Sequence, residues 1–121
     1  MSVNNVMYGS EDTEQEKIFA WAELMERTYP CLKLMYHVPN EGKRSEAAGA
    51  RMKRMGLRRG VPDICLPIAR GGYHGLYIEL KFGKNKPTEE QRQFLRALDI
   101  EGFWPWSVTV LTKRSGLYSG M

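Results

Sequence analysis

Two short apolar runs between Gly60 and Lys84 constrain the fold of this 121-residue chain more than any other feature. The runs, Val61–Ala69 and Gly75–Phe82, are separated by an Arg-Gly-Gly turn signal, so they predict a β-hairpin. Side chains alternate between the two faces of a strand. One face of the hairpin is therefore apolar, and the other carries three charged residues, Asp63, Glu79 and Lys81.

The expected pairing of these strands brings the two carboxylates together. A hairpin centred on Gly71 places Asp63 directly opposite Glu79, with Lys81 on the same face. Directly opposed like charges destabilise a sheet, and a bound divalent cation would compensate for them. Magnesium or manganese binds one or two carboxylates together with water and substrate phosphate, and Lys81 would orient a bound water or stabilise a phosphoryl group. The alternative is a structural Asp–Lys or Glu–Lys bridge at a sheet edge.

The rest of the chain predicts helices and strands in mixed order, and hence an α/β fold. Helices are expected over residues 12–28 and 45–56 and after Thr88, with Asp12 or Thr13, Ser45 and Thr88 as N-caps. Strands are expected over residues 31–38 and 103–112. The side chains expected to face the core from the helices are Ile18, Trp21, Ala22, Met25, Phe94, Leu95 and Leu98.

Length and composition indicate a single intracellular domain over residues 1–121, with a flexible N-terminus over residues 1–10. No apolar run approaches the roughly 20 residues that span a bilayer, and the first residues lack a signal-peptide pattern. Cys31 and Cys65 have no metal-ligand spacing and are expected to be buried small hydrophobic residues. With His37 and His74 far apart in the sequence, a zinc site is not expected.

Basic residues concentrate between Lys43 and Arg59, where Glu46 is the single acid. Such a segment would be attracted to a phosphate backbone, and its affinity would fall as salt rises. The alternative is a solvated helix face. The candidate nucleic-acid-binding residues are Lys43, Arg44, Arg51, Lys53, Arg54, Arg58 and Arg59.

The charged hairpin resembles the core of the PD-(D/E)xK nuclease superfamily, since Pro62-Asp63 is followed by Glu79-Leu80-Lys81. The longer stretch from Tyr36 to Phe103 closely resembles the stand-alone VRR-NUC (virus-type replication-repair nuclease) domains carried by phages, and the resemblance covers residues 12 to 104. It implies a restriction-endonuclease-like core with a mixed β-sheet flanked by helices. It also implies a homodimeric, Mg²⁺- or Mn²⁺-dependent DNA endonuclease acting on branched or Holliday-junction DNA in the cytoplasm of a bacterial host.

Residue roles follow from the resemblance position by position. Asp63 and Glu79 would ligate the metal together with the carbonyl of Leu80, and Lys81 would activate the attacking water. Glu14 resembles the family's N-terminal acid, which reaches the metal directly or through water; Glu16 is the weaker candidate because it lies off the apolar stripe.

Further positions keep alternatives open. Gln91 resembles the helix glutamine that positions the active site, or is a plain exposed helix residue. His37 and Asn40 line the site, or His37 is a packed strand residue, while Glu41 stands where the family's substrate-side loop usually has glycine. Arg70 and Tyr73 contact DNA or fill a partner interface.

The chain after Phe103 departs from the family pattern of a strand, a Cys-Tyr-Gly-like turn and an acid-rich helix. One codon spelling, read one base out of frame from the last base of the Pro105 codon, gives VVCYGFDEAVGAL and a stop, which is that ending. We therefore expect residues 104–121 to be an atypical tail created by a single-base deletion, with a last strand kept at Ser107–Thr112 and the closing helix lost. Sequencing the coding DNA tests this hypothesis.

The rival function is a non-catalytic DNA-binding module that keeps the nuclease fold and the basic helix. Intact Asp63, Glu79 and Lys81 argue against it, because clustered carboxylates beside phosphates weaken binding unless a metal uses them.

Overall fold

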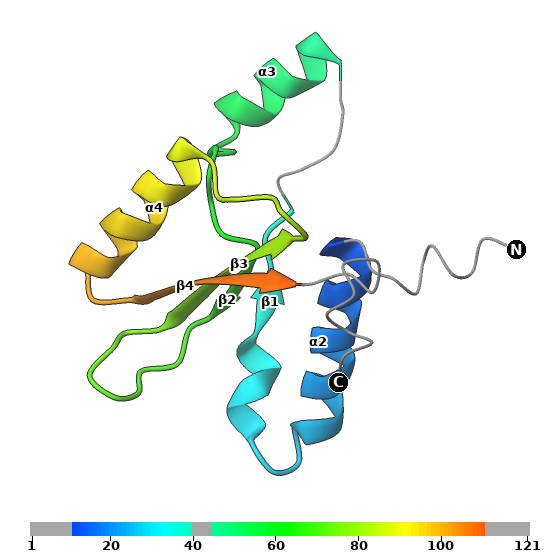
Figure 1. The fold of residues 1–121 in the computed structure, drawn as a ribbon, viewed down its shortest axis with the longest axis vertical. Helices are drawn as coiled ribbons and strands as arrows, with labels where there is room; N and C mark the ends of the chain where they lie inside the picture. The colour runs from blue at the N-terminus through cyan, green and yellow to red at the C-terminus, as the bar shows by residue number, and fades with distance from the viewer. Residues whose placement is uncertain (1–10, 40–44, 111–121) are drawn as a thin grey trace, which may run out of the picture.

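The fold is a mixed β-sheet with helices on both faces, seen in a computed structural model that describes residues 11–39 and 45–110 (Figure 1). The helices are α2 (Glu11–Met25), the 3-10 helix η1 (Pro30–Leu34), α3 (Glu46–Arg54) and α4 (Glu89–Ile100). The strands are β1 (Tyr36–His37), β2 (Ile64–Leu66), β3 (Leu76–Phe82) and β4 (Trp104–Val110). The expected α/β class and mixed sheet are confirmed.

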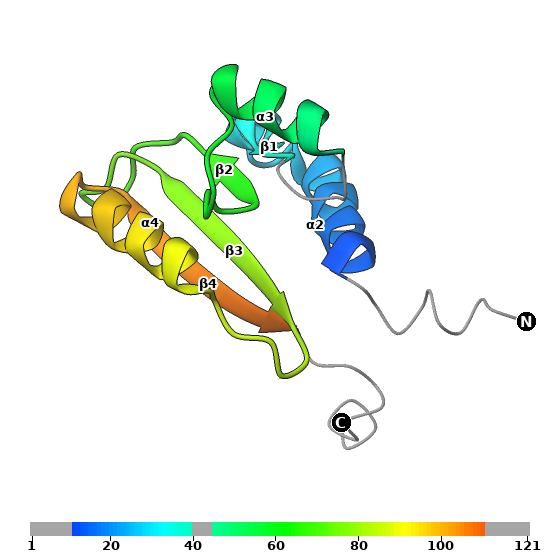
Figure 2. The same cartoon turned by 90° about the horizontal axis from the view of Figure 1, so that it is seen from above.

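The four-stranded sheet has the order β1-β2-β3-β4. The first three strands pair antiparallel, whereas β4 pairs parallel to β3 after the chain has crossed over through α4. Figures 1 and 2 show α3 and α4 on one side of the sheet and α2 on the other. The observed pairs Ile64↔Ile78, Cys65↔Tyr77 and Leu66↔Leu76 have the register expected for a hairpin centred on Gly71.

The core lies between the sheet and α2. Ile64, Ile78 and Leu80 form its buried cluster, and Ile18 and Phe19 of α2 pack against them. Because side chains alternate along β3, the core side chains take one face and Glu79 and Lys81 take the face toward α4. The apolar stripe expected on α2 is correct for Ala22, which is 3% exposed, but wrong for Trp21, which is 52% exposed.

Two helix starts are confirmed by their caps. The Ser45 hydroxyl accepts a hydrogen bond from the N–H of Ala48 at 3.1 Å, and Thr88 forms a reciprocal capping box with Gln91. The N-cap expected at Asp12 or Thr13 is wrong, since α2 already begins at Glu11, and this helix ends at Met25 rather than at residue 28.

The strand expected over residues 31–38 is confirmed only for its end, β1 (Tyr36–His37), and is wrong before it, because the chain there forms η1. Pro30 stands in the first turn of η1, where its fixed φ and missing N–H are tolerated. Strand β2 is shorter than expected because Pro62 and Pro67, on either side of it, have no N–H to donate to a neighbouring strand.

The expected last strand is confirmed as β4, which ends at Val110. The rest of the tail, residues 111–121, and the N-terminal segment 1–10 lie outside the described residues, so the expectations for them are not tested. Across the described part of the chain, no helix is long and apolar enough to cross a membrane.

Candidate metal and catalytic site

The expected carboxylate pair lies where β2 meets β3. Asp63 directly precedes β2, and its Oδ2 accepts a hydrogen bond from the N–H of Leu80 at 2.8 Å, which fixes its carboxylate beside the chain that carries Glu79. The Asp63 carbonyl accepts from the N–H of Val38 at 2.8 Å and lies 3.2 Å from His37 Nδ1. His37 therefore supports the backbone of Asp63 from β1.

Glu79 and Lys81 are charged side chains buried beside each other. Lys81 Nζ lies 3.6 Å from Glu79 Oε2, and the two side chains are 11% and 2% exposed. Burying a charge costs free energy unless the charge is paired and hydrogen-bonded. In the parallel register these residues stand beside Ser107 and Thr109, whose small side chains occupy the same face of β4.

Gln91 connects α4 to this pair. Its Nε2 donates to Glu79 Oε2 at 2.9 Å, while its Oε1 accepts from the N–H of Thr88 at 2.8 Å. One side chain therefore caps α4 and holds the Glu79 carboxylate. Of the two roles considered for Gln91, the exposed helix residue is excluded by these contacts.

A close backbone contact supports the same end of α4. Gly60, at φ +85°, lies so near α4 that an added Cβ would be 2.6 Å from the carbonyl oxygen of Glu90 and 3.0 Å from the nitrogen of Gln91. Sequence reasoning missed this contact, because a glycine between two loops gives no signal of the element that it approaches.

The donor set fits a hard divalent ion. The Asp63 and Glu79 carboxylates and the Leu80 carbonyl would supply oxygen ligands, and Mg²⁺ is usually held by one or two carboxylates with water and substrate phosphate completing its shell. The described residues hold no group of three His, Cys, Asp or Glu side chains placed to share one ion.

Glu14 consequently does not join Asp63 and Glu79. Its Oε2 pairs with Lys17 Nζ at 3.1 Å, and it lines a hollow with Ile78 and Leu80 on the α2 face of the sheet. The structure places this candidate on the opposite face from Glu79.

A row of polar side chains continues the Glu79 face. Tyr36, Cys65 and Tyr77 lie directly opposite one another across β1, β2 and β3. Burial raises the pKa of Tyr77 to about 12, assisted by its hydrogen bond with Cys65. The hydrogen bond with Cys65 is also the main cause that raises the pKa of Tyr36. Both phenols therefore keep their protons at neutral pH, and Cys65 is buried as expected.

The candidate nucleic-acid residues that the structure describes are exposed on and after α3. Arg51, Lys53 and Arg54 occupy its last turn, and Arg58 and Arg59 follow. Arg59 Nη1 lies 3.5 Å from Glu90 Oε2, so the basic segment is attached to the start of α4. Figure 2 shows α3 and α4 on the same side of the sheet. Lys43, Arg44, Asn40 and Glu41 lie outside the described residues.

Arg70 and Tyr73 lie at the hairpin end of the other face. The Arg70 guanidinium approaches Cys31 Sγ at 3.9 Å, and the ring of Tyr73 packs edge-on against Trp104 with centroids 4.8 Å apart. They are thus separated by the sheet from Asp63, Glu79 and Lys81.

Comparisons with known proteins concern the family and the fold of this chain. The family model of the VRR-NUC domain matches residues 10–110, which extends beyond the limit expected near Phe103 and includes β4. A solved structure titled VRR_NUC domain protein is similar at 29% sequence identity with a TM-score of 0.66, covering 92% of this chain and 84% of that one. A search of curated proteins finds no match.

Proposed function

This chain belongs to the VRR-NUC domain family, a family of nuclease domains, and on that premise we propose that it is a metal-dependent endonuclease that hydrolyses DNA phosphodiester bonds. The observation that carries the proposal is the burial of Glu79 against Lys81 and Gln91. The Asp63 carboxylate accepts a hydrogen bond from the N–H of Leu80, the residue that follows Glu79 in β3. A binding module would gain nothing from two carboxylates on the face toward which phosphate must approach.

Each residue of the site has a distinct task. Asp63 and Glu79, with the Leu80 carbonyl, would hold Mg²⁺ or Mn²⁺. Such an ion supplies Lewis-acid polarisation of the phosphate and eases loss of a proton from water. Lys81 presents an ammonium donor 3.6 Å from Glu79, where it can orient the attacking water and stabilise negative charge on the phosphate. Gln91 fixes the Glu79 carboxylate through one amide hydrogen bond.

The basic segment on and after α3 supplies the affinity for DNA. Its exposed arginines and lysine lie on the side of the sheet that carries Glu79, so phosphate contacts there would bring a duplex toward the site. We propose branched DNA as the substrate and a homodimer as the active form, because two sites related by a two-fold axis suit a four-way junction.

Cleavage assays on labelled four-way junction, flap, duplex and single-stranded DNA test the activity. The protein should cut with Mn²⁺ or Mg²⁺ and not with EDTA, and the junction should be cut fastest. Lys81→Ala should abolish cutting while junction binding is retained. Folded protein that binds the junction but leaves every substrate intact with Mn²⁺ would establish the DNA-binding module instead. Faster cutting of duplex or flap DNA would support the nuclease activity and exclude the four-way junction as the preferred substrate.

A further inference from the structure

The face of the sheet that carries Glu79 ends, at the edge strand β1, in an aromatic side chain that the proposed chemistry does not use. Tyr36 lies directly opposite Cys65, and Cys65 lies directly opposite Tyr77. Because β1 is the first strand in the sheet order, this row ends at Tyr36 within the described residues. Tyr36 is 49% exposed, whereas Cys65 beside it is 2% exposed. A large, flat side chain therefore stands half in water at the open edge of the Glu79 face.

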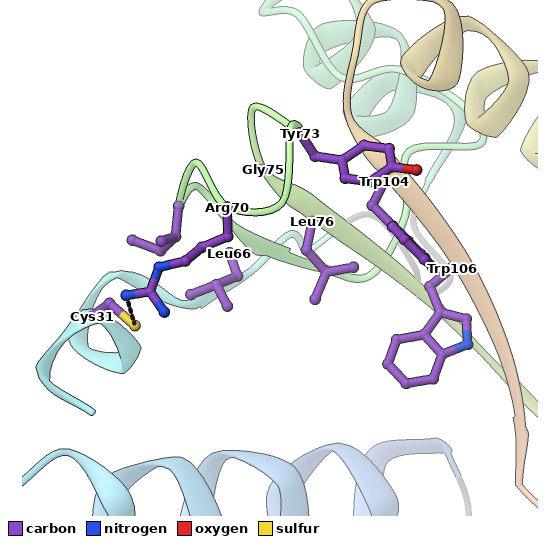
Figure 3. A pocket seen from close by; sticks show the side chains of 9 residues that line it. Cys31, Leu66, Arg70, Tyr73, Gly75, Leu76, Trp104 and Trp106 are labelled. Atoms are coloured by element: carbon purple, nitrogen blue, oxygen red, sulfur yellow. Dashed lines mark hydrogen bonds between the residues drawn. The ribbon is translucent and has the colours of Figure 1, made fainter. Parts of the chain in front are cut away.

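The other exposed aromatic side chains of the described strands lie on the opposite face. Trp106 of β4 stands beside Ile78 of the core, and Trp104 lies two residues earlier on the same face. Both tryptophans line a hollow of about 340 Å³ there (Figure 3). Among the strands that the structure describes, Tyr36 is therefore the exposed aromatic residue that shares a face with the candidate metal ligands.

Tyr36 lies close enough to the candidate metal site to meet the same DNA strand. The N–H of Val38 donates to the carbonyl of Asp63, so Val38 stands opposite Asp63 and Tyr36 is the diagonal neighbour of Asp63. Diagonal neighbours on paired strands are about 7–8 Å apart, and successive phosphates of one DNA strand follow at about 3.4 Å along the duplex axis. A phosphate held at Asp63 therefore places Tyr36 about two nucleotides away.

The hydroxyl of Tyr36 is already engaged, and this decides which part of the side chain a ligand would meet. It is hydrogen-bonded with Cys65, and this bond is the main cause that raises the pKa of Tyr36. The bond also holds the ring in place beside β2, while about half of the side chain stays exposed. An aromatic ring that is held in advance loses little conformational freedom when a second flat group stacks on it.

An unpaired nucleobase is the flat group that DNA can supply at this position. Stacking of a base on an aromatic ring tolerates any sequence, because every base has a π face. Inside an intact duplex a base must first be unstacked, and this costs least where the base is already unpaired. We propose that the ring of Tyr36 stacks on a base exposed at the branch point, about two nucleotides from the phosphate held at the carboxylates. The contact rests on the proposed function and specifies the feature of branched DNA that the site recognises.

Binding without cleavage tests this contact separately from the nuclease activity. The protein is titrated, with EDTA and at low salt, into a labelled four-way junction and into an intact duplex of the same sequence, and fluorescence anisotropy gives the two dissociation constants. Tyr36→Leu should weaken binding to the junction by about 5- to 100-fold, the range expected for one lost base stack, and binding to the duplex by less than about twofold. Tyr36→Phe keeps the ring and should retain most of the affinity that Tyr36→Leu loses.

Two controls locate the contact. Tyr29→Leu is the matched variant, because Tyr29 is 51% exposed before η1, and it should bind the junction like the unchanged chain. Abasic residues are also placed in turn at each position around the branch point. One of these positions should weaken binding of the unchanged chain by about the same factor as Tyr36→Leu, and combining it with Tyr36→Leu should add little. The abasic series needs no variant, so it tests the contact whether or not Tyr36→Leu folds.

Four results would overturn the inference. Folded Tyr36→Leu, judged by circular dichroism, could bind the junction as tightly as the unchanged chain, or no abasic position could change the affinity. An equal loss on junction and intact duplex would mean that Tyr36 does not recognise the branch point. A loss in Tyr36→Phe as large as in Tyr36→Leu would assign the contact to the hydroxyl and not to the ring. If the expected binding is found but Mn²⁺ supports no cutting, the stacking contact stands and the nuclease proposal fails.

Discussion

Replacing Gln91 by alanine tests whether this side chain holds the site or only caps a helix. The substitution removes two hydrogen bonds, one to the backbone of Thr88 and one to the buried carboxylate of Glu79. A hydrogen bond to a charged group contributes about 1.5–3 kcal/mol and a neutral, exposed one about 0.5–1 kcal/mol. The expected loss is therefore about 2–4 kcal/mol in the free energy of unfolding, a large part of the 5–15 kcal/mol typical of a domain.

Thr88→Ala is the matched control for the cap. It removes the hydroxyl that accepts from the N–H of Gln91 at 3.2 Å, at a cost of about 1 kcal/mol, and leaves the contact with Glu79 in place. Residues that orient a metal ligand typically contribute 10–100-fold in metal affinity or activity. Gln91→Ala should lose about that factor in cleavage rate, whereas Thr88→Ala should stay within about twofold.

The measurement is single-turnover cleavage of a labelled junction across a range of Mn²⁺ concentrations, with urea unfolding of each variant beside it. Equal loss of rate in the two variants at conditions where both are folded would mean that capping alone matters. An unchanged metal dependence in Gln91→Ala would refute the argument that its amide orients Glu79.

Three further predictions concern other parts of the fold. Gly60→Ala should destabilise by about 1–3 kcal/mol more than Gly56→Ala, since both glycines have positive φ but only Gly60 would meet backbone; urea unfolding compares them, and equal losses would contradict the contact. Replacing Lys53 and Arg54 by alanine should reduce the magnitude of the slope of log affinity for DNA against log salt concentration by about 0.9 per lost phosphate contact, whereas the control Lys33→Ala should leave the slope unchanged. An unchanged slope in the double variant would mean that DNA does not contact the end of α3. The pKa of Tyr77 is about 12 in the folded chain and about 10 in the unfolded chain, so the protonated phenol contributes to the free energy of unfolding fully below pH 10, and this contribution is lost as the pH rises through 12. Tyr77→Phe should therefore lose less stability than the unchanged chain between these pH values. Equal losses of the two proteins in alkaline unfolding would refute this prediction.

The charged hairpin could be predicted because its information is local. The turn residues and the alternation of Asp63, Glu79 and Lys81 determine both the pairing and the face, and the observed register agrees. The caps at Ser45 and Thr88 were equally predictable, because a hydroxyl directly before a helical pattern commonly accepts a hydrogen bond from the free N–H groups of the first helical turn.

What the sequence did not predict depends on contacts between distant segments. The pattern of residues 31–38 alternates like a strand, yet Pro30 and the packing of Leu32 favour η1. Helical periodicity placed Trp21 in the core, but its side chain lines an open hollow between α2 and β4 and stays exposed. The approach of Gly60 to α4 exists only after both segments have folded.

The residues of the site lie close together in the sequence, and this affects when the site forms during folding. Asp63, Glu79, Lys81 and Gln91 all lie within one hairpin and the helix that follows it. Contacts between near neighbours in sequence close small loops and form early in folding. The site would therefore be assembled by the middle of the chain before α2 docks, and changes in either terminus would alter the lifetime of the folded protein more than the geometry of its chemistry.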